Sequence, residues 1–406
     1  MSAFPAMRRG ACPSLPKPMQ TGDGLLARLQ PLAPLTLDQL AGLARLAAER
    51  GNGILEVTAR GKLQLRGLTP ATAPGLPEAV AALDIDVPQG FPVEVSALAG
   101  RDPAERFDPR ELARAISERA APLVPNLAPK ASVVVDGGGR FRLGGLKADI
   151  AVTAGSEGVA LSLAGVPCGV VGAARAAEVV VALLQRLAAQ GPAARMVDIV
   201  AVEGSENLRA GFGLAPPSTV PEEGADPVGL HALTDGTLAL GLGLEFGQVR
   251  AEMLDQLLEA THRAGVAEVE PAAGRALLLV GIAPEAAEAL RAEAAGLGFL
   301  TDPGDPRRRV FACAGRPACA SARLDTHALA ATLVPLLDGR DLHVSGCPKG
   351  CAHPAKAALT IVGLDEGAGL VVEGTPRDAL RDPTPAVLPA TAVAGAVRAL
   401  LQKDLA

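Results

Sequence analysis

The chain has 406 residues, 49% hydrophobic and 20% charged, which predicts a large core divided among two or more domains or duplicated units. Its 38 basic and 44 acidic residues give a net charge of −6 with no basic block, and Trp and Tyr are absent, which argues against nucleic acid as a ligand. Every window of about eighteen residues, the length that a membrane-spanning helix needs, contains a charged residue, Gly or Pro. The N-terminus lacks the apolar run of a secretory signal. We therefore expect no membrane partner and a cytoplasmic location.

The first distinct block, residues 35–57, predicts an amphipathic helix between two strands. Its apolar residues Leu40, Leu43, Leu46 and Ala47 are spaced to share one helix face. Residues 249–270 repeat this pattern at an offset of about half the chain, and each copy leads into an apolar run that ends near a glycine. The sequence therefore indicates an internal duplication.

The stretch GNGILEVTARGKLQLRGL, residues 51–68, has polar side chains at the alternate positions 58, 60, 62, 64 and 66. This alternation predicts one strand with a polar face and an apolar face. A solvated strand face would explain the pattern. Two arginines beside Thr and Gln could instead clamp carboxylates, because a guanidinium binds a carboxylate through two parallel hydrogen bonds. The matching segment of the second copy, PAAGRALLLVG, is apolar.

Four of the six cysteines form two pairs, Cys313 with Cys319 and Cys347 with Cys351. Each pair follows a short strand-like run, residues 310–312 in one case and DLHVSG in the other, so each is expected on a loop at a strand end. Cys12 and Cys168 stand alone, and the role of Cys12 is open. In a reducing compartment, clustered cysteines more often bind metal than form disulfides.

The paired cysteines are compatible with zinc, with an iron–sulfur cluster or with buried free thiols. The Cys-x5-Cys spacing is wider than the usual zinc knuckle. Small residues around the thiols leave room for a cluster and expose backbone N–H groups to its sulfurs, which favours the cluster. His343 and His353 flank the second pair and could be iron ligands, proton donors or structural side chains.

The forms ACAGRPAC and SGCPKGC resemble the 4Fe-4S signature of the sulfite and nitrite reductase superfamily, and residues 58–64 resemble its macrocycle-binding pattern Thr-x-Arg-x-x-x-Gln. The resemblance implies a pseudo-duplicated α/β (α+β) fold. Two ferredoxin-like half-domains would span residues 15–90 and 215–295, and two larger α/β domains would span 91–214 and 296–406. It also implies four ligands of a 4Fe-4S cluster, with the last linking the cluster to the reaction centre: Cys313, Cys319, Cys347 and Cys351.

The segments RRGACPSLPKPMQTGDGLLARL and SALAGRDP, together with residues 51–68, are most similar to the precorrin-3B synthase family of aerobic cobalamin biosynthesis. This resemblance implies a monooxygenase that uses dioxygen to hydroxylate the tetrapyrrole precorrin-3A at C-20, with γ-lactone formation. It further implies a mononuclear non-haem iron and an external electron donor, a reductase or a ferredoxin. The residues expected to bind substrate are Arg28, Thr58, Arg60, Gln64, Arg66 and Lys130.

The alternative is a siroheme-dependent sulfite or nitrite reductase. Sulfite reductases bind their anion with two arginines and two lysines. Arg28 and Lys130 match one of each, but Ser132 and Phe91 occupy the other two positions. Losing two positive charges would weaken a site that must stabilise charge on an anion, which favours the oxygenase. Phe91 also departs from the synthase family, where an Arg-Asn pair usually stands.

Overall fold

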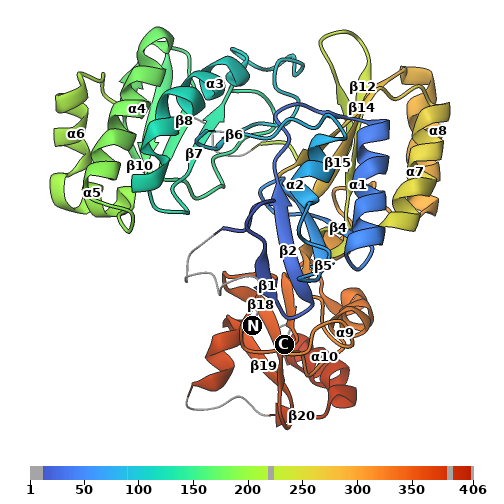
Figure 1. Ribbon diagram of the computed structural model, residues 1–406. Helices are drawn as coiled ribbons and strands as arrows, with labels where there is room; N and C mark the ends of the chain where they lie inside the picture. The colour runs from blue at the N-terminus through green and yellow to red at the C-terminus, as the bar shows by residue number, and fades with distance from the viewer. Residues whose placement is uncertain (1–11, 89, 218–223, 382–386, 404–406) are drawn as a thin grey trace.

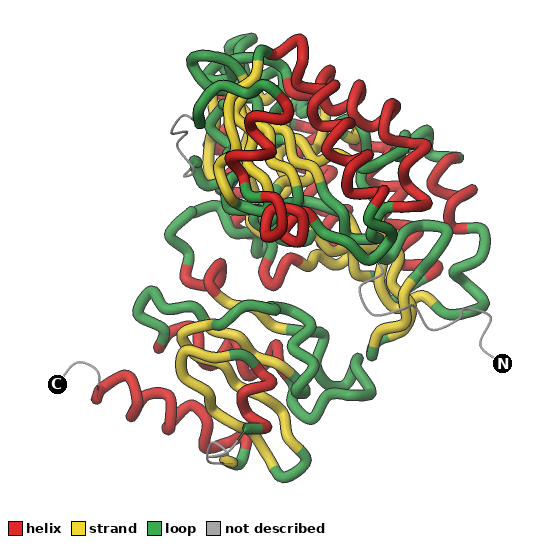
Figure 2. Tube along the Cα trace, turned by 90° about the vertical axis from the view of Figure 1, so that its left-hand side faces the viewer, coloured by secondary structure: helices red, strands yellow, loops and turns green. Residues whose placement is uncertain are grey.

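The computed structural model describes residues 12–88, 90–217, 224–381 and 387–403, and its strands form four five-stranded sheets (Figure 1). In Figure 1 the sheet built from residues 93–171 lies to one side in green, and two sheets in blue and yellow lie opposite it. The C-terminal sheet, in orange and red, forms a lobe beneath them, and in Figure 2 this lobe again lies below the other sheets. The α/β class predicted from the sequence is confirmed.

The blue and yellow sheets belong to the two copies of the duplicated unit. The first has the order β1 (Met19–Thr21), β2 (Gly24–Leu29), β5 (Leu63–Leu68), β4 (Ile54–Val57) and β13 (Gln248–Arg250). The second has the order β11 (Gly229–Ala232), β12 (Leu238–Gly243), β15 (Ala276–Ile282), β14 (Glu268–Ala272) and β3 (Leu35–Thr36). Each sheet therefore takes its last strand from the other copy. This exchange was not predicted, and it ties the two copies together.

Four helices accompany these two sheets: α1 (Leu37–Arg50), α2 (Leu76–Ala81), α7 (Ala251–Arg263) and α8 (Pro284–Gly296). Helix α1 begins with a capping box, in which Thr36 accepts from the amide of Gln39 at 3.2 Å and Gln39 accepts from the amide of Thr36 at 2.9 Å. Of its predicted apolar face, Leu40, Leu43 and Ala47 are buried and Leu46 is partly buried, and one continuous core joins the helix to α7 and to both sheets.

A separate sheet, which belongs to neither copy of the duplicated unit, contains the strands from residues 93 to 171. Its order is β10 (Val166–Val171), β9 (Val159–Leu163), β8 (Ile150–Ala154), β7 (Val133–Asp136) and β6 (Val93–Val95), with β6, β7 and β8 parallel. It is accompanied by α3 (Pro109–Ala120), η1 (Ala121–Asn126), α4 (Ala173–Ala189), α5 (Met196–Glu203) and α6 (Ser205–Phe212). Strands β7 and β8 matter for the site because polar residues precede each of them.

The C-terminal sheet has the order β16 (Val310–Ala312), β17 (Leu342–Ser345), β18 (Ala357–Leu364), β19 (Gly367–Gly374) and β20 (Val387–Leu388). The helices α9 (Thr326–Leu333) and α10 (Val393–Lys403) pack on it around a core that includes Val344 and Ile361. Strands β16 and β17 are the two strands expected before the cysteine pairs, and both predictions are confirmed.

One expectation about residues 51–68 was wrong. The stretch is not a single strand but a hairpin, in which β4 and β5 flank a turn at residues 58–62. The Thr58 hydroxyl accepts from the amides of Arg60 and Lys62 at 3.3 and 3.0 Å, and Gly61 adopts a positive φ of 74°. The polar residues there reflect turn chemistry, which a test for alternation cannot separate from a strand face.

Within the part of the chain that the structure describes, no helix combines the length and apolar character needed to cross a bilayer. The bounds of the four predicted domains stay a prediction; β3 and β13 each pair with a sheet of the other copy.

Candidate functional site

The two cysteine pairs lie at one edge of the C-terminal sheet. Strands β16 and β17 are parallel, with Ala312 opposite Val344, so the loops that follow them begin side by side. Cys313 comes directly after β16, and Cys347 comes two residues after β17. The amide of Gly346 donates to Sγ of Cys313 at 3.2 Å, which joins the two loops.

The four thiols are close enough to influence one another. Burial raises the pKa of the Cys351 thiol, and the charges of Cys313, Cys347 and Cys319 raise it further. All four cysteines are free. Such a concentration of thiols is unfavourable when they ionise, and a cation or cationic cluster among them would remove that cost.

Two glycines bring the backbone against these sulfurs. A Cβ on Gly22, in the turn between β1 and β2, would lie 2.2 Å from Sγ of Cys319, and Ala320 donates its amide to the Gly22 carbonyl at 3.0 Å. A Cβ on Gly346 would lie 2.7 Å from Cβ of Ala322 and 3.5 Å from Sγ of Cys313. The first half of the chain therefore touches the cysteine loops directly. Sequence reasoning missed the role of Gly22.

Nowhere in the described residues are three or more His, Cys, Asp or Glu side chains arranged to hold a single metal ion. A 4Fe-4S cluster takes its four thiolates on four different irons, so it needs them further apart than the ligands of one ion. Four free thiols on two adjoining loops, with a backbone amide aimed at one sulfur, fit such a cluster better than zinc.

Of the expected substrate residues, Arg28 and Gln64 face each other on β2 and β5. With the Gln64 amide oxygen turned toward it, Arg28 donates from Nε and Nη2 at 2.9 and 2.6 Å. Among the described residues no carboxylate forms an ion pair with Arg28. Burial lowers the pKa of this guanidinium. Arg28 is thus a half-buried cation without an anion of its own.

Arg66 is held by protein carboxylates. Its Nη2 lies 2.8 Å from Asp23, in the turn that contains Gly22, and its Nη1 lies 2.8 Å from Glu56 on β4. Burial alone would lower the pKa of Arg66, but the two carboxylates raise it above its ordinary value. This arginine therefore braces the turn that touches Cys319.

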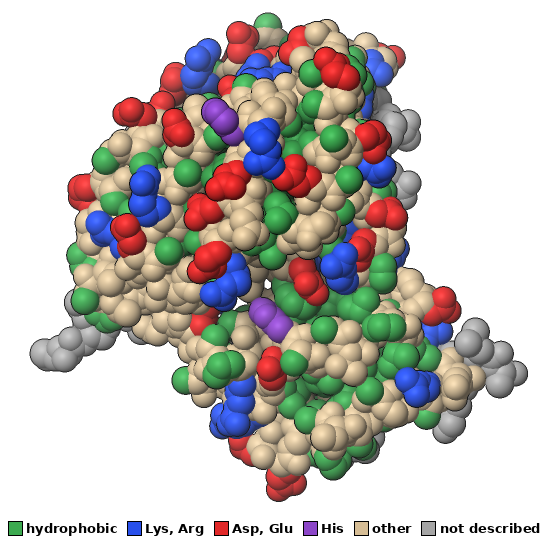
Figure 3. Space-filling model, turned by 90° about the vertical axis from the view of Figure 1, so that its right-hand side faces the viewer, with side chains coloured by type: hydrophobic (Ala, Val, Ile, Leu, Met, Phe, Trp, Pro, Cys, Tyr) green, Lys and Arg blue, Asp and Glu red, His purple; other side chains and the backbone are tan. Residues whose placement is uncertain are grey.

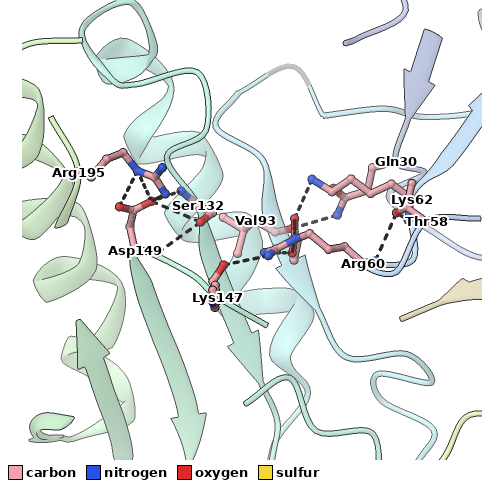
Figure 4. A network of polar contacts seen from close by, with 10 residues as sticks. Gln30, Thr58, Arg60, Lys62, Val93, Ser132, Lys147, Asp149 and Arg195 are labelled. Carbon is pink, nitrogen blue, oxygen red and sulfur yellow. Dashed lines mark hydrogen bonds and ion pairs between the residues drawn. The ribbon is translucent and has the colours of Figure 1, made fainter. Parts of the chain in front are cut away.

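Arg60 lies where the first half-domain meets the sheet of residues 93–171, in the network of Figure 4. Its Nε and Nη2 donate to one oxygen of Glu94 at 2.9 and 2.5 Å, and its Nη1 donates to the Lys147 carbonyl at 2.9 Å. Lys62 also contacts Glu94, at 2.7 Å. Burial would raise the pKa of Glu94, but these cations lower it. Lys130 is exposed just after η1.

A second charged group in Figure 4 was missed by sequence reasoning. Asp149, before β8, pairs with Arg195, before α5, at 2.8 Å, and it accepts from the amide of Ser132 at 3.0 Å. Ser132 is the position where the reductase pattern expects a lysine. The only sequence signal for this contact would have been the isolated Asp149 before an apolar strand.

A cavity of about 280 Å³ opens beside Arg60, with walls from three units of the fold. Glu94, Arg101, Arg110 and Glu270 contribute charge to it. Burial raises the pKa of Glu270 to about 7, although the Leu98 amide donates to it at 3.0 Å. On the face shown in Figure 3, a hollow with charged side chains at its rim separates the C-terminal lobe from the body.

The two histidines near the second cysteine pair contact each other edge to face. His343 is fully buried on β17, and neither ring nitrogen has a partner among the described residues. Burial lowers its pKa to about 4. His353 meets its edge at a centroid distance of 5.8 Å and stacks on Phe311 at 4.0 Å. His353 therefore packs between His343 and Phe311.

Fold and site together define a member of the sulfite and nitrite reductase superfamily. Residues 17–83 match the nitrite/sulfite reductase ferredoxin-like half domain. The chain is 24% identical, over 87% of its length and 79% of the relative's, to a ferredoxin–nitrite reductase of Synechococcus elongatus. Its fold is similar to that of the Mycobacterium tuberculosis NirA protein, with a TM-score of 0.69 at 20% identity, covering 93% of this chain and 80% of that one.

A more similar relative narrows this class. The chain is 43% identical to a precorrin-3B synthase of a Sinorhizobium species, over 91% of its own length and 84% of the relative's. The chain belongs to the precorrin-3B synthase family.

Proposed function

We propose that this protein is a monooxygenase that converts precorrin-3A to precorrin-3B. One oxygen atom of dioxygen enters the substrate at C-20, with γ-lactone formation. The other leaves as water, using two electrons and two protons from an external donor. Membership of the synthase family supports this reaction, and the observation that carries it in the structure is the convergence of four free thiols on two adjoining loops, against the turn of Gly22.

The cofactor roles follow from the thiols. Cys313, Cys319, Cys347 and Cys351 would hold a 4Fe-4S cluster, which supplies electrons one at a time. The family resemblance adds a mononuclear non-haem iron, and a reductase or ferredoxin as the donor. A cytoplasmic location is consistent with thiols that must stay reduced.

The substrate roles follow from position and charge. Arg28 offers a guanidinium that no protein carboxylate neutralises among the described residues, and it is therefore the primary candidate to pair with a tetrapyrrole carboxylate. Gln64 fixes its orientation. Thr58 and Arg60 shape the neighbouring turn, Arg66 holds the turn of Gly22 through Asp23, and Lys130 is an exposed cation.

The direct test supplies the anaerobically purified protein with precorrin-3A, a chemical reductant and isotope-labelled dioxygen. The proposal predicts a product that has gained one labelled oxygen atom. Reduction of sulfite or nitrite by the same preparation, with no oxygen transfer to precorrin-3A, would instead identify a siroheme reductase.

A further inference from the structure

Lys349 links the two cysteine loops through its side chain. It lies between Cys347 and Cys351, in the loop that follows β17, and it is exposed to solvent. Its Nζ donates to the Ser321 hydroxyl at 3.0 Å. Ser321 lies two residues after Cys319, in the loop that follows β16. The Lys349 side chain therefore crosses from one cysteine loop to the other.

Two further hydrogen bonds join the same loops. The amide of Arg323 donates to the Gly346 carbonyl at 2.7 Å, and the amide of Gly346 donates to Sγ of Cys313 at 3.2 Å. Gly346 itself is buried at the end of β17, where a Cβ would lie 2.7 Å from Cβ of Ala322. These contacts hold the two loops together, so the Lys349 ammonium stays beside the loops that carry the four sulfurs.

The charge of Lys349 acts close to two of the proposed cluster ligands. Lys349 is two residues from each of Cys347 and Cys351, so its Cα lies within about 7 Å of theirs. Among the described residues no carboxylate forms an ion pair with Lys349, whereas Arg323 on the other loop pairs with Asp365 at 2.7 Å. In this part of the chain Lys349 therefore adds a positive charge that no carboxylate offsets.

We propose that the Lys349 ammonium raises the reduction potential of the cluster that the four thiolates hold, and so widens the range of donors that can reduce it. This inference rests on the proposed function. A one-electron donor adds one negative charge to the thiolate-bound group, and no bond forms or breaks. A nearby cation stabilises that added charge by Coulomb attraction, and charge near the sulfurs is one of the factors that set such potentials. Ser321 keeps the cation in place across the two loops.

The test is an anaerobic redox titration of the cluster-containing protein with dithionite, followed by cluster absorbance. At a fixed potential, Lys349→Met should lower the ratio of reduced to oxidised cluster about tenfold, which for one electron is a shift of about 59 mV. Lys349→Arg keeps the charge and should stay within about twofold of the wild type. The matched control is Arg263→Met, which removes an exposed cation from α7, in another unit of the fold. It should titrate as the wild type does.

Ser321→Ala is the second variant, and it decides the question if Lys349→Met retains no cluster. It keeps every charge and removes only the hydroxyl that holds the ammonium, so it should lower the same ratio by about two- to threefold. A wild-type ratio in cluster-containing Lys349→Met, or in Ser321→Ala where Lys349→Met holds no cluster, would overturn the inference. Wild-type protein that binds neither iron nor sulfide would instead overturn the cluster assignment of the proposed function.

Discussion

Gly22 lies against Cys319: a Cβ at position 22 would come within 2.2 Å of the cysteine sulfur. The contact joins the first strand pair of the chain to the proposed cluster loops. We predict that Gly22→Ala displaces Cys319 and lowers the iron and sulfide bound per chain by half or more, measured after anaerobic purification. Gly211→Ala is the control, since nothing lies within 4 Å of a Cβ built there. Full cluster content in Gly22→Ala would show that the loop can move without cost.

Cys351 is the cysteine that the family resemblance links to the reaction centre. Replacing it with Ser should abolish the cluster and the oxygenase activity together, because a hydroxyl is a poor ligand for iron–sulfur clusters. Iron analysis and dioxygen uptake check this. Cys168→Ser should leave both unchanged, since Cys168 lies on β10, where its thiol donates to the Ser205 carbonyl at the start of α6 at 3.6 Å, and it belongs to neither cysteine loop. An intact cluster with full turnover in Cys351→Ser would contradict the ligand assignment.

Arg66 stabilises the turn that carries Gly22 through Asp23 and Glu56. Arg66→Met should lower the free energy of unfolding by about 3 kcal/mol, because two shielded carboxylates lose their partner. Urea denaturation measures this. The exposed pair of Arg263 with Glu293 provides the comparison, and Arg263→Met should cost about 0.5 kcal/mol or less.

The same ion pair predicts a dependence on pH. Burial would raise the pKa of Asp23, but its bonds with Arg66 lower it below the ordinary 3.8. A lowered carboxyl pKa adds stability that is complete above the unfolded value and is lost as the pH falls through the folded value. The acid side of the stability curve should therefore be less steep in Arg66→Met than in the wild type, and equal slopes would refute this role of the pair.

Glu270 predicts the opposite trend at higher pH. Burial raises its pKa from 4.5 to about 7, so the folded protein binds a proton that the unfolded chain releases. Stability should fall as the pH rises from about 4.5 to 7. Glu270→Gln should remove part of this fall in the melting temperature, while exposed Glu288→Gln should not. A pH profile unchanged in Glu270→Gln would mean that other groups cause it.

Local signals in the sequence were sufficient for several elements. The strands before both cysteine pairs and the helices α1 and α7 were predictable, because apolar spacing reports burial within one segment. The strand exchange was not, since β3 has two residues and β13 has three, too few for a pattern. The hairpin at residues 58–62 was missed because turn residues and a polar strand face use the same side chains.

In the candidate site, too, residue type and spacing predicted some features, and contacts between distant segments were missed. Cysteine spacing identified the four thiols, because the chemistry of ligation restricts residue type. The contact of Gly22 with Cys319 and the bond of Arg195 with Asp149 join segments far apart in the chain, and only the fold brings them together. Arg60 and Arg66 were predicted to bind substrate from their residue type alone. That reasoning could not show that protein carboxylates already pair with them, namely Glu94 with Arg60, and Asp23 and Glu56 with Arg66.

The central claim is tested most directly by an absorbance spectrum of protein purified without oxygen, with iron and acid-labile sulfide counted on the same sample. If the protein is a precorrin oxygenase, its spectrum should show a broad absorbance shoulder in the blue and no Soret band. The sample should contain more iron than sulfide, because a mononuclear iron adds to the iron of the cluster. A Soret band would contradict the account and identify a siroheme reductase.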